Sequence, residues 1–158
     1  MINNLVYVGY VTGVFGIKGE IKCNFETNHL KDILIINNYL YINNDKYTIS
    51  SIKNNNNHYI VGLKEIDDIS KVDDLLRKKI YINRSDYTNI DYFTFELFNL
   101  NIIDNEKKVG IIEEVLYNKN NLLIKTGNML IPLVDKYVKE INVEKGFISV
   151  KDIEELRL

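Results

Sequence analysis

Residues 8–22 read VGYVTGVFGIKGEIK and decide the fold of this chain. The stretch begins within Leu5–Val14, which is apolar on both faces, as expected of a strand buried within a barrel. It ends within Glu20–Phe25, where polar and apolar side chains alternate strictly, as they do in a half-buried strand. The chain must reverse between the two strands, so the stretch predicts an all-β protein.

Three glycines shape this reversal. Gly16 and Gly19 flank the two residues at the turn, and glycine readily supplies the positive φ that a tight turn needs. Together with Gly13 they make up the predicted structural turn. A phosphate-binding loop is excluded, because the spacing matches neither GxGxxG nor a loop that ends in Gly-Lys-Ser/Thr.

The alternating pattern continues through the first half of the chain. The segments 39–42 and 46–49 flank an Asn-Asn-Asp turn and predict a hairpin, and further strands are expected at 59–63 and 80–82. These strands and the opening pair predict a first small barrel.

Residues 67–79 have helical spacing instead. Ile69, Val72 and Leu76 fall on one face at i, i+3 and i+7, and the acidic pair before them can cap a helix. The basic residues at the far end suit the negative end of the helix dipole. We therefore expect one short helix in the first barrel.

A polar segment separates the two halves of the chain. Beyond it, short strands recur every 8–12 residues or so, which indicates a second small barrel. These strands are expected at residues 100–103, 108–117, 122–125, 129–132 and 147–150, with a turn at 119–121. The predicted organisation is a first barrel at 1–84, a linker at 85–91 and a second barrel at 92–158.

Composition and charge exclude several classes of protein. A chain of 158 residues with 46% hydrophobic residues is not disordered, and no apolar run approaches the roughly 20 residues that span a bilayer. The N-terminal residues lack the basic and apolar regions of a secretory signal, and a lone Cys23 suits a reducing compartment such as the cytoplasm. The net charge of −2 argues against binding nucleic acid by bulk electrostatics.

Charge is divided unevenly between the halves. Residues 1–84 carry 11 Lys and Arg against 9 Asp and Glu, a net +2, whereas residues 85–158 carry 9 against 13, a net −4. Either surface charge is partitioned at random, or the halves meet two partners of opposite character.

The sequence contains few residues that could form a catalytic or metal site. His29, His58 and Cys23 are scattered, and a zinc site needs three or four such ligands together. Adjacent carboxylates, as in the pairs at 113–114 and 154–155, point to opposite faces of a strand and make poor acid–base pairs. We predict no enzymatic activity, no metal and no cofactor.

Aromatic residues directly follow the linker. Tyr92 and Phe93 would face opposite ways in a strand, so both are buried only if a domain interface or a partner covers both sides. Phe95 and Phe98 are assigned to the core of the second barrel.

At five places, in the right order, the chain resembles the RimM family of ribosome maturation factors. The matching residues are 8–22, 67–82, 91–93, 109–115 and 130–141. The resemblance implies a translation-factor-like six-stranded barrel followed by a PRC barrel, in agreement with the two barrels predicted from the strands. One departure is Phe15, which stands where the family usually has His.

The resemblance also implies a function. RimM proteins are assembly factors without a catalytic centre that bind the small ribosomal subunit during maturation of its head. They contact ribosomal protein S nineteen and support 16S rRNA processing. The family's aromatic pair carries over to Tyr92 and Phe93 as the ribosomal-protein contact. We expect a cytoplasmic monomer that does not associate with membranes.

Two questions stay open on the sequence. Lys18 and Lys22, near the glycine turn of the net-positive half, are either rRNA contacts or ordinary solvated lysines. The alternative to an assembly factor is a small β-barrel module that binds rRNA without a ribosomal-protein partner. Salt separates the two hypotheses, because a complex led by phosphate contacts weakens steeply as salt is added.

Overall fold

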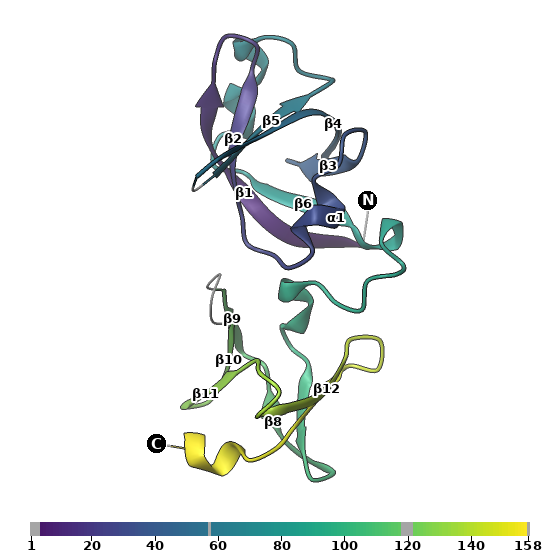
Figure 1. Ribbon diagram of the computed structural model, residues 1–158, viewed down its shortest axis with the longest axis vertical. Coiled ribbons are helices and arrows are strands. Elements are labelled where there is room, and N and C mark those ends of the chain that lie inside the picture. The colour runs from purple at the N-terminus through teal and green to yellow at the C-terminus, as the bar shows by residue number, and fades with distance from the viewer. Residues whose placement is uncertain (1–3, 57, 118–121, 158) are drawn as a thin grey trace. The chain divides into compact units, whose positions relative to one another are not determined.

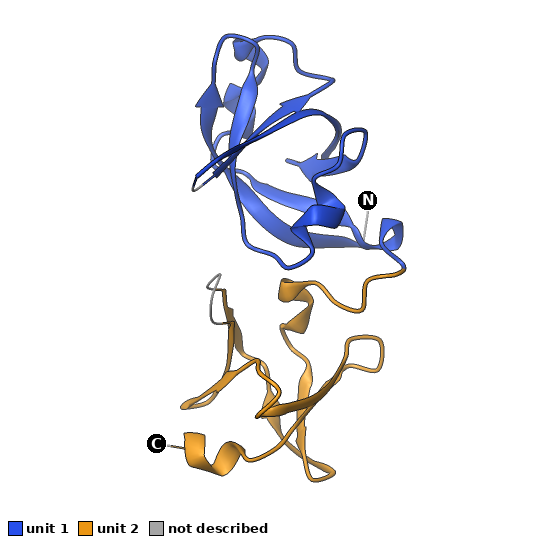
Figure 2. Cartoon of the chain, viewed as in Figure 1, with its two compact units in different colours: residues 1–88 blue, residues 89–158 orange. Residues whose placement is uncertain are grey.

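The structure is a computed structural model in which residues 4–56, 58–117 and 122–157 are described. Strands dominate, and the chain divides into two units: unit 1, Met1–Thr88, and unit 2, Asn89–Leu158 (Figure 2). The prediction of an all-β protein with barrel-like sheets is confirmed. Within the described ranges, every helix is too short or too polar to cross a membrane.

Unit 1 is a closed barrel of six strands in the order β1-β2-β5-β4-β3-β6, in which β6 pairs back onto β1 (Figure 1). Every neighbouring pair is antiparallel. The strands are β1 Leu5–Phe15, β2 Glu20–Phe25, β3 Tyr39–Ile42, β4 Asp45–Asn55, β5 His58–Leu63 and β6 Lys79–Asn83. In β2 the alternation has its expected effect, because Ile21, Cys23 and Phe25 are buried inside the barrel.

The long strand β1 bends twice as it closes the barrel. Its register shifts between Tyr7 and Gly9 against β6, and between Val11 and Gly13 against β2. At Gly9 a Cβ atom would lie only 2.4 Å from the carbonyl oxygen of Asn24, so the strands approach at a distance that only glycine permits. Because the register against β2 shifts between Val11 and Gly13, Gly13 lies at a bulge within β1 and not in the turn, contrary to the sequence prediction.

The helix expected over residues 67–79 is not an α-helix. The segment forms two 3₁₀ helices, η1 Ile69–Lys71 and η2 Asp73–Leu75. Val72 and Leu75 are the buried residues, and a spacing of three places them on one face of a 3₁₀ helix.

Two of the three residues assigned to the helical face are only partly buried. Ile69 is 48% exposed and Leu76 is 37% exposed, so the spacing of 3.6 residues per turn was the wrong period. The expected acidic cap is present, because the Asp68 carboxylate accepts the N–H of Ser70 at 2.8 Å. A four-residue α-helix, α1 Leu30–Ile33, lies elsewhere in unit 1 and was not predicted.

Unit 2 contains two sheets around one core. A three-stranded sheet has the order β11-β10-β9, and a four-stranded sheet has the order β12-β13-β7-β8, in which β13 and β7 are parallel. The strands are β7 Asn101–Asp104, β8 Lys107–Ile111, β9 Glu114–Leu116, β10 Leu123–Thr126, β11 Met129–Pro132, β12 Val138–Asn142 and β13 Phe147–Val150. Both sheets contribute to the core, with Ile102, Ile124, Ile131 and Ile148 fully buried.

Three 3₁₀ helices complete the chain: η3 Arg84–Asp86, η4 Thr94–Leu97 and η5 Ile153–Leu156. Within η4, Leu97 joins the core of unit 2. The next residue, Phe98, is 54% exposed, so the prediction that it belongs to the core was wrong. The side chain that follows a buried one on a short turn points outward.

The single strand expected over 108–117 is two strands in different sheets. Between β8 and β9, the N–H of Ile112 donates to Leu100 O and the N–H of Glu113 donates to Lys125 O. The chain therefore crosses from the four-stranded to the three-stranded sheet at this point. Strand β12 was missed, because its register shifts between Val138 and Glu140 and breaks the alternation. The turn predicted at 119–121 lies outside the described residues.

Candidate functional site

A row of side chains lies on the outer face of unit 1, across three neighbouring strands. Lys22 on β2 and Lys53 on β4 both pair with Ile60 on β5, which lies between them. Residues paired across antiparallel strands project from the same face. Because Ile21 and Cys23 on either side of Lys22 point into the barrel, this shared face is the outer one.

The Phe15 ring lies near both lysines. Phe15 ends β1 on the same outer face, and its side chain is 38% exposed. The Nζ atom of Lys22 lies 5.9 Å from the ring centroid, and that of Lys53 lies 5.8 Å from it. Both distances are within the roughly 6 Å at which an ammonium group is attracted to an aromatic ring. We call Phe15, Lys22 and Lys53 the cationic platform.

The β1–β2 turn stands beside this platform. Gly16 and Gly19 have φ of 69° and 77°, so both occupy the left-handed region that favours glycine. Ile17 between them is 84% exposed, and Lys18 is exposed as well. Lys18 and Lys53 line a common open groove of about 510 Å³.

The structure thus brings Lys22 into a cluster with an aromatic ring and places Lys18 on the adjoining turn. Sequence reasoning missed Phe15 and Lys53. An apolar ring at the end of a strand, followed by the exposed Ile17, was a usable signal for Phe15. Lys53 gave no local signal, because only the strand order β2-β5-β4 brings it beside the ring.

In unit 2, Tyr92 and Phe93 directly precede η4 and do not lie in a strand, so the prediction that they face opposite sides of a strand was wrong. The backbone N–H of Phe93 donates to Glu96 Oε1 at 2.9 Å, which fixes the start of the helix. Phe93 is fully buried, whereas Tyr92 is half-buried and packs against the core of unit 2. Burial, together with the Asp91 charge, raises the pKa of Tyr92 above its ordinary value. Of the pair, Tyr92 is the one that presents surface.

Reactive groups are few. Burial raises the pKa of the Cys23 thiol, so this side chain stays protonated inside the barrel and is a poor nucleophile. In the described parts of the chain, no three His, Cys, Asp or Glu side chains gather as a metal site would require. The features that this surface offers are charge and an exposed ring, which are features of binding.

Comparison with known proteins identifies the family. The model described as RimM N-terminal domain matches residues 6–87. The protein named ribosome maturation factor RimM from Carboxydothermus hydrogenoformans is 30% identical over 95% of this chain and 94% of its own length. The protein of that name from Mesoplasma florum is 31% identical over 98% of each chain.

Two solved structures are also similar. A crystal structure described as a putative 16S ribosomal RNA processing protein RimM from Pseudomonas aeruginosa has 23% identity and a TM-score of 0.47, covering 92% of this chain and 96% of its own. The N-terminal domain of RimM from Thermus thermophilus has 18% identity and a TM-score of 0.44, covering 52% of this chain and 92% of its own. The family model spans more than half of the chain and the curated relatives extend through both units, so this chain belongs to the RimM family.

Proposed function

We propose that this chain is a non-enzymatic ribosome assembly factor. It binds ribosomal protein S nineteen and the head of the immature small ribosomal subunit, and it supports small-subunit maturation and 16S rRNA processing as a cytoplasmic monomer. The observation that carries the proposal is the match to proteins named ribosome maturation factor along both units of the chain.

The charges of the two units fit two partners. The part from residue 85 onward has a net charge of −4 and suits a basic ribosomal protein, because opposite charge steers association and suppresses wrong partners. The part up to residue 84 has a net charge of +2 and carries the cationic platform, which suits rRNA. Tyr92 is the proposed anchor for the protein contact, since a half-buried tyrosine offers apolar area and a hydroxyl group together.

Phe93 takes a different role in this proposal. Its side chain is fully buried and its backbone N–H is bound by Glu96. It supports the segment that presents Tyr92 and does not itself meet the partner. Phe93→Ala would therefore report on packing, and Tyr92→Ala is the informative variant.

The test is calorimetric titration of the full chain with ribosomal protein S nineteen of the same organism at low and high salt. We expect one-to-one binding, micromolar or tighter, that survives added salt. Tyr92→Ala should weaken it about 10-fold, the loss of a moderate interface anchor. Tyr39→Ala is the matched control, because Tyr39 is a 41% exposed tyrosine on unit 1.

The result that contradicts the proposal is absence of binding when both proteins are folded. The cationic platform would then favour the second candidate, an rRNA-binding module that uses no ribosomal-protein partner. An unchanged affinity for Tyr92→Ala would leave the function in place and show that the protein contact lies elsewhere.

A further inference from the structure

We propose that the cationic platform binds single-stranded RNA, with one unpaired base stacked on the Phe15 ring and the adjoining phosphates held by Lys22 and Lys53. The inference rests on the proposed function in taking RNA as the ligand of unit 1. It adds which chemical form of RNA is bound and which residues read it.

The first argument is that the ring is open to a ligand. Phe15 is 38% exposed although it is fully apolar, and the neighbouring Ile17 is 84% exposed. Burying either in water-free contact with a partner is favourable, at roughly 25 cal/mol per Å² of apolar surface. Base–aromatic stacking supplies such a contact, and it suits every base because each has a π-face.

The second argument is that the flanking cations are held in place by the barrel. Ile60 lies between Lys22 and Lys53 on the outer face and is only 3% exposed, so the aliphatic parts of the lysines and their neighbours cover it. A Cβ atom at Gly13 would meet Lys22 Cδ at 3.6 Å, which shows that the lysine stem lies across this glycine. The ammonium groups are therefore directed toward the ring by three paired strands.

The third argument is that these cations are not neutralised from within. Among the described residues, Lys18, Lys22 and Lys53 form no ion pair with a carboxylate. Two acids line the groove beside Lys18. Asp67 pairs with Lys71 at 2.8 Å, whereas Glu20 accepts a hydrogen bond from the neutral Ser51 Oγ at 3.3 Å and keeps its negative charge within the groove. Phosphate oxygens are natural partners for the three free charges.

The choice of single-stranded RNA follows from the combination of ring and cations. In a duplex the faces of the bases are stacked inside the helix, so an exposed ring gains nothing from them. An unpaired base presents a face of about the size of the Phe15 ring with a phosphate on either side, which suits one ring with two ammonium groups near it. A purely electrostatic site would have had no use for Phe15.

The first experiment measures affinity for a labelled heptaadenylate by fluorescence anisotropy. Phe15→Ala should weaken binding about 5- to 150-fold, the range for loss of one base–aromatic stack, and Phe15→Tyr should retain it. Phe98→Ala is the matched control, since Phe98 is an exposed phenylalanine on unit 2 and should bind as the parent does. An RNA duplex of the same length should bind more weakly than the single strand.

The second experiment uses the absence of tryptophan from the natural sequence. Phe15→Trp introduces a single indole at the platform, and unlabelled heptaadenylate should quench its fluorescence as a base stacks on it. Phe98→Trp should show no change. This arm also keeps the test decisive if Phe15→Ala fails to fold.

The third experiment counts the phosphate contacts. Lys22→Gln and Lys53→Gln should each reduce the slope of log affinity against log salt by about 0.7. Lys46→Gln, which alters an exposed lysine at the opposite end of β4 from Lys53, should not.

Equal affinity of Phe15→Ala and the parent chain overturns the platform, as does binding without quenching in Phe15→Trp. Either result would leave binding to ribosomal protein S nineteen untouched. Failure of that binding would overturn the proposed function and leave the RNA platform standing.

Discussion

The two units of this chain differ in how the edges of their sheets are paired. In the described part of unit 1, each of the six strands pairs with two neighbours and the barrel closes, whereas the two sheets of unit 2 end in β8 and β12 and in β9 and β11. Exposed edges invite pairing with other chains, and lysines and bulges discourage it. Strand β8 has both, with Lys107 and Lys108 at its start and a register shift beside Val109.

The close approaches at glycine differ in what would have to yield. In unit 1 a Cβ atom at Gly9 would meet the backbone of a paired strand, with Asn24 O at 2.4 Å and Phe25 Cα at 2.9 Å, whereas one at Gly62 would meet a side chain, Ser51 Oγ at 2.3 Å. In unit 2 the corresponding glycine, Gly110, faces a side chain, with Thr126 Oγ1 at 2.5 Å. A methyl group at Gly9 would therefore press on backbone, whereas one at Gly62 or Gly110 would press on a side chain that can still rotate.

The sharpest test of this difference is alanine at each glycine. Gly9→Ala should destabilise unit 1 by at least about 3 kcal/mol, because a backbone clash between paired strands cannot be relieved by rotating a side chain. Gly110→Ala should destabilise unit 2 by about 1 kcal/mol. Amide hydrogen exchange followed by mass spectrometry measures the two units separately within the full chain.

A second substitution tests the reason given for this difference. Thr126→Ala should restore most of the stability lost in Gly110→Ala, since it removes the hydroxyl that the new methyl group meets. No side-chain change at Asn24 or Phe25 should rescue Gly9→Ala. Equal losses at the two glycines, or rescue at both, would contradict the contrast between a backbone contact and a side-chain contact.

Smaller effects are expected at the turn glycines. Gly19 and Gly146 have nearly the same φ, 77° and 79°, but a Cβ at Gly19 would lie 2.6 Å from Asp68 O, whereas nothing lies within 4 Å of one at Gly146. Gly146→Ala should cost about 1 kcal/mol for the left-handed backbone alone, and Gly19→Ala about 2 kcal/mol or more because the clash adds to it.

Asparagine separates the two costs at these turns. Asn tolerates the left-handed region better than Ala does, so Gly146→Asn should recover part of the loss. Gly19→Asn should not, because its Cβ meets Asp68 as well. Hydrogen exchange in β2 and in β13 provides the measurement, and recovery at both sites would show that the Gly19 turn is less enclosed than the structure has it.

Much of the fold follows from alternation in the sequence. The strict pattern of Glu20–Phe25 correctly places β2, and the Asn-Asn-Asp turn correctly places the hairpin of β3 and β4. Local patterns failed where the chain changes its course. Ile112 stays buried while the chain passes between two sheets, so its segment looks like one continuous strand. Val72 and Leu75 are three apart, a spacing that fits both an α-helix and a 3₁₀ helix.

The candidate site was predictable only in part, for a similar reason. Lys22 could be assigned to the outer face from alternation in β2 alone. Lys53 lies near the same ring because both lysines pair with Ile60. The sequence of either segment alone does not predict which distant strand it pairs with. The failed expectation for Phe93 arose because residues before η4 do not follow the geometry of a strand.

Each unit also contains a carboxylate that should make it sensitive to acid. In unit 1, Glu65 accepts hydrogen bonds from Thr48 N at 2.7 Å and Thr48 Oγ1 at 2.8 Å. Burial works to raise the pKa of Glu65, but these bonds outweigh it and the pKa lies below the ordinary 4.5. In unit 2, hydrogen bonds from Lys136 and Tyr137 hold the pKa of Glu155 below 4.5.

Both carboxylates stabilise their units when they are ionised. Because each pKa is lower in the folded state, the stabilisation is complete above pH 4.5 and is lost as the pH falls through the folded value. High salt should weaken the acid dependence of unit 2, where the Lys136 charge is the main cause, more than that of unit 1, where uncharged donors dominate and the Lys64 charge contributes least. Urea titrations monitored by NMR signals of each unit measure this, with Glu65→Gln and Glu155→Gln as the insensitive references. Equal salt effects in the two units would contradict the assignment of a neutral and a charged partner.

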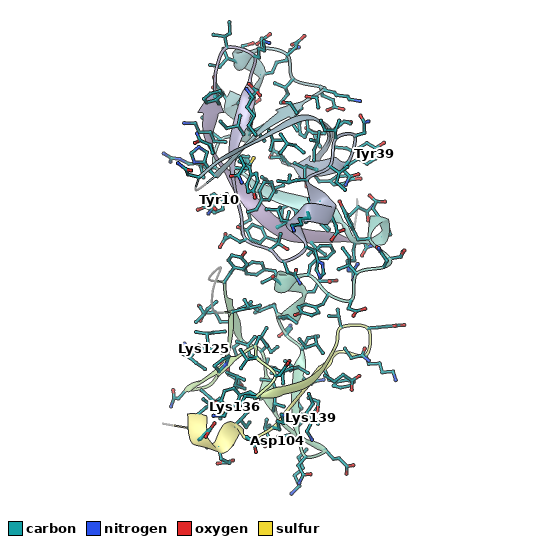
Figure 3. The ribbon with its side chains drawn as sticks, in the orientation of Figure 1. Tyr10, Tyr39, Asp104, Lys125, Lys136 and Lys139 are labelled. Carbon is teal, nitrogen blue, oxygen red and sulfur yellow. The ribbon has the colours of Figure 1, made fainter. Side chains whose placement is uncertain are left out.

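The smallest effect compares two lysines that lie over tyrosine rings, Lys46 over Tyr39 in unit 1 and Lys136 over Tyr137 in unit 2. Tyr39 and Lys136 are labelled in Figure 3. Lys46 Nζ lies 3.8 Å from the Tyr39 ring centroid, whereas Lys136 Nζ lies 5.2 Å from that of Tyr137 and also pairs with Glu155. Lys46→Met keeps the apolar stem and should destabilise unit 1 by about 0.5 kcal/mol, the value of an exposed cation–aromatic contact. The double substitution with Tyr39→Leu should cost little more than Tyr39→Leu alone, since the lysine then has no ring to meet. In unit 2, Lys136→Met should lose its effect when combined with Glu155→Gln, because there the carboxylate and not the ring is the main partner of the ammonium group. If the effect of Lys136→Met instead depended on the ring of Tyr137, both lysines would be stabilised mainly by a cation–aromatic contact, and the two units would not differ in this respect.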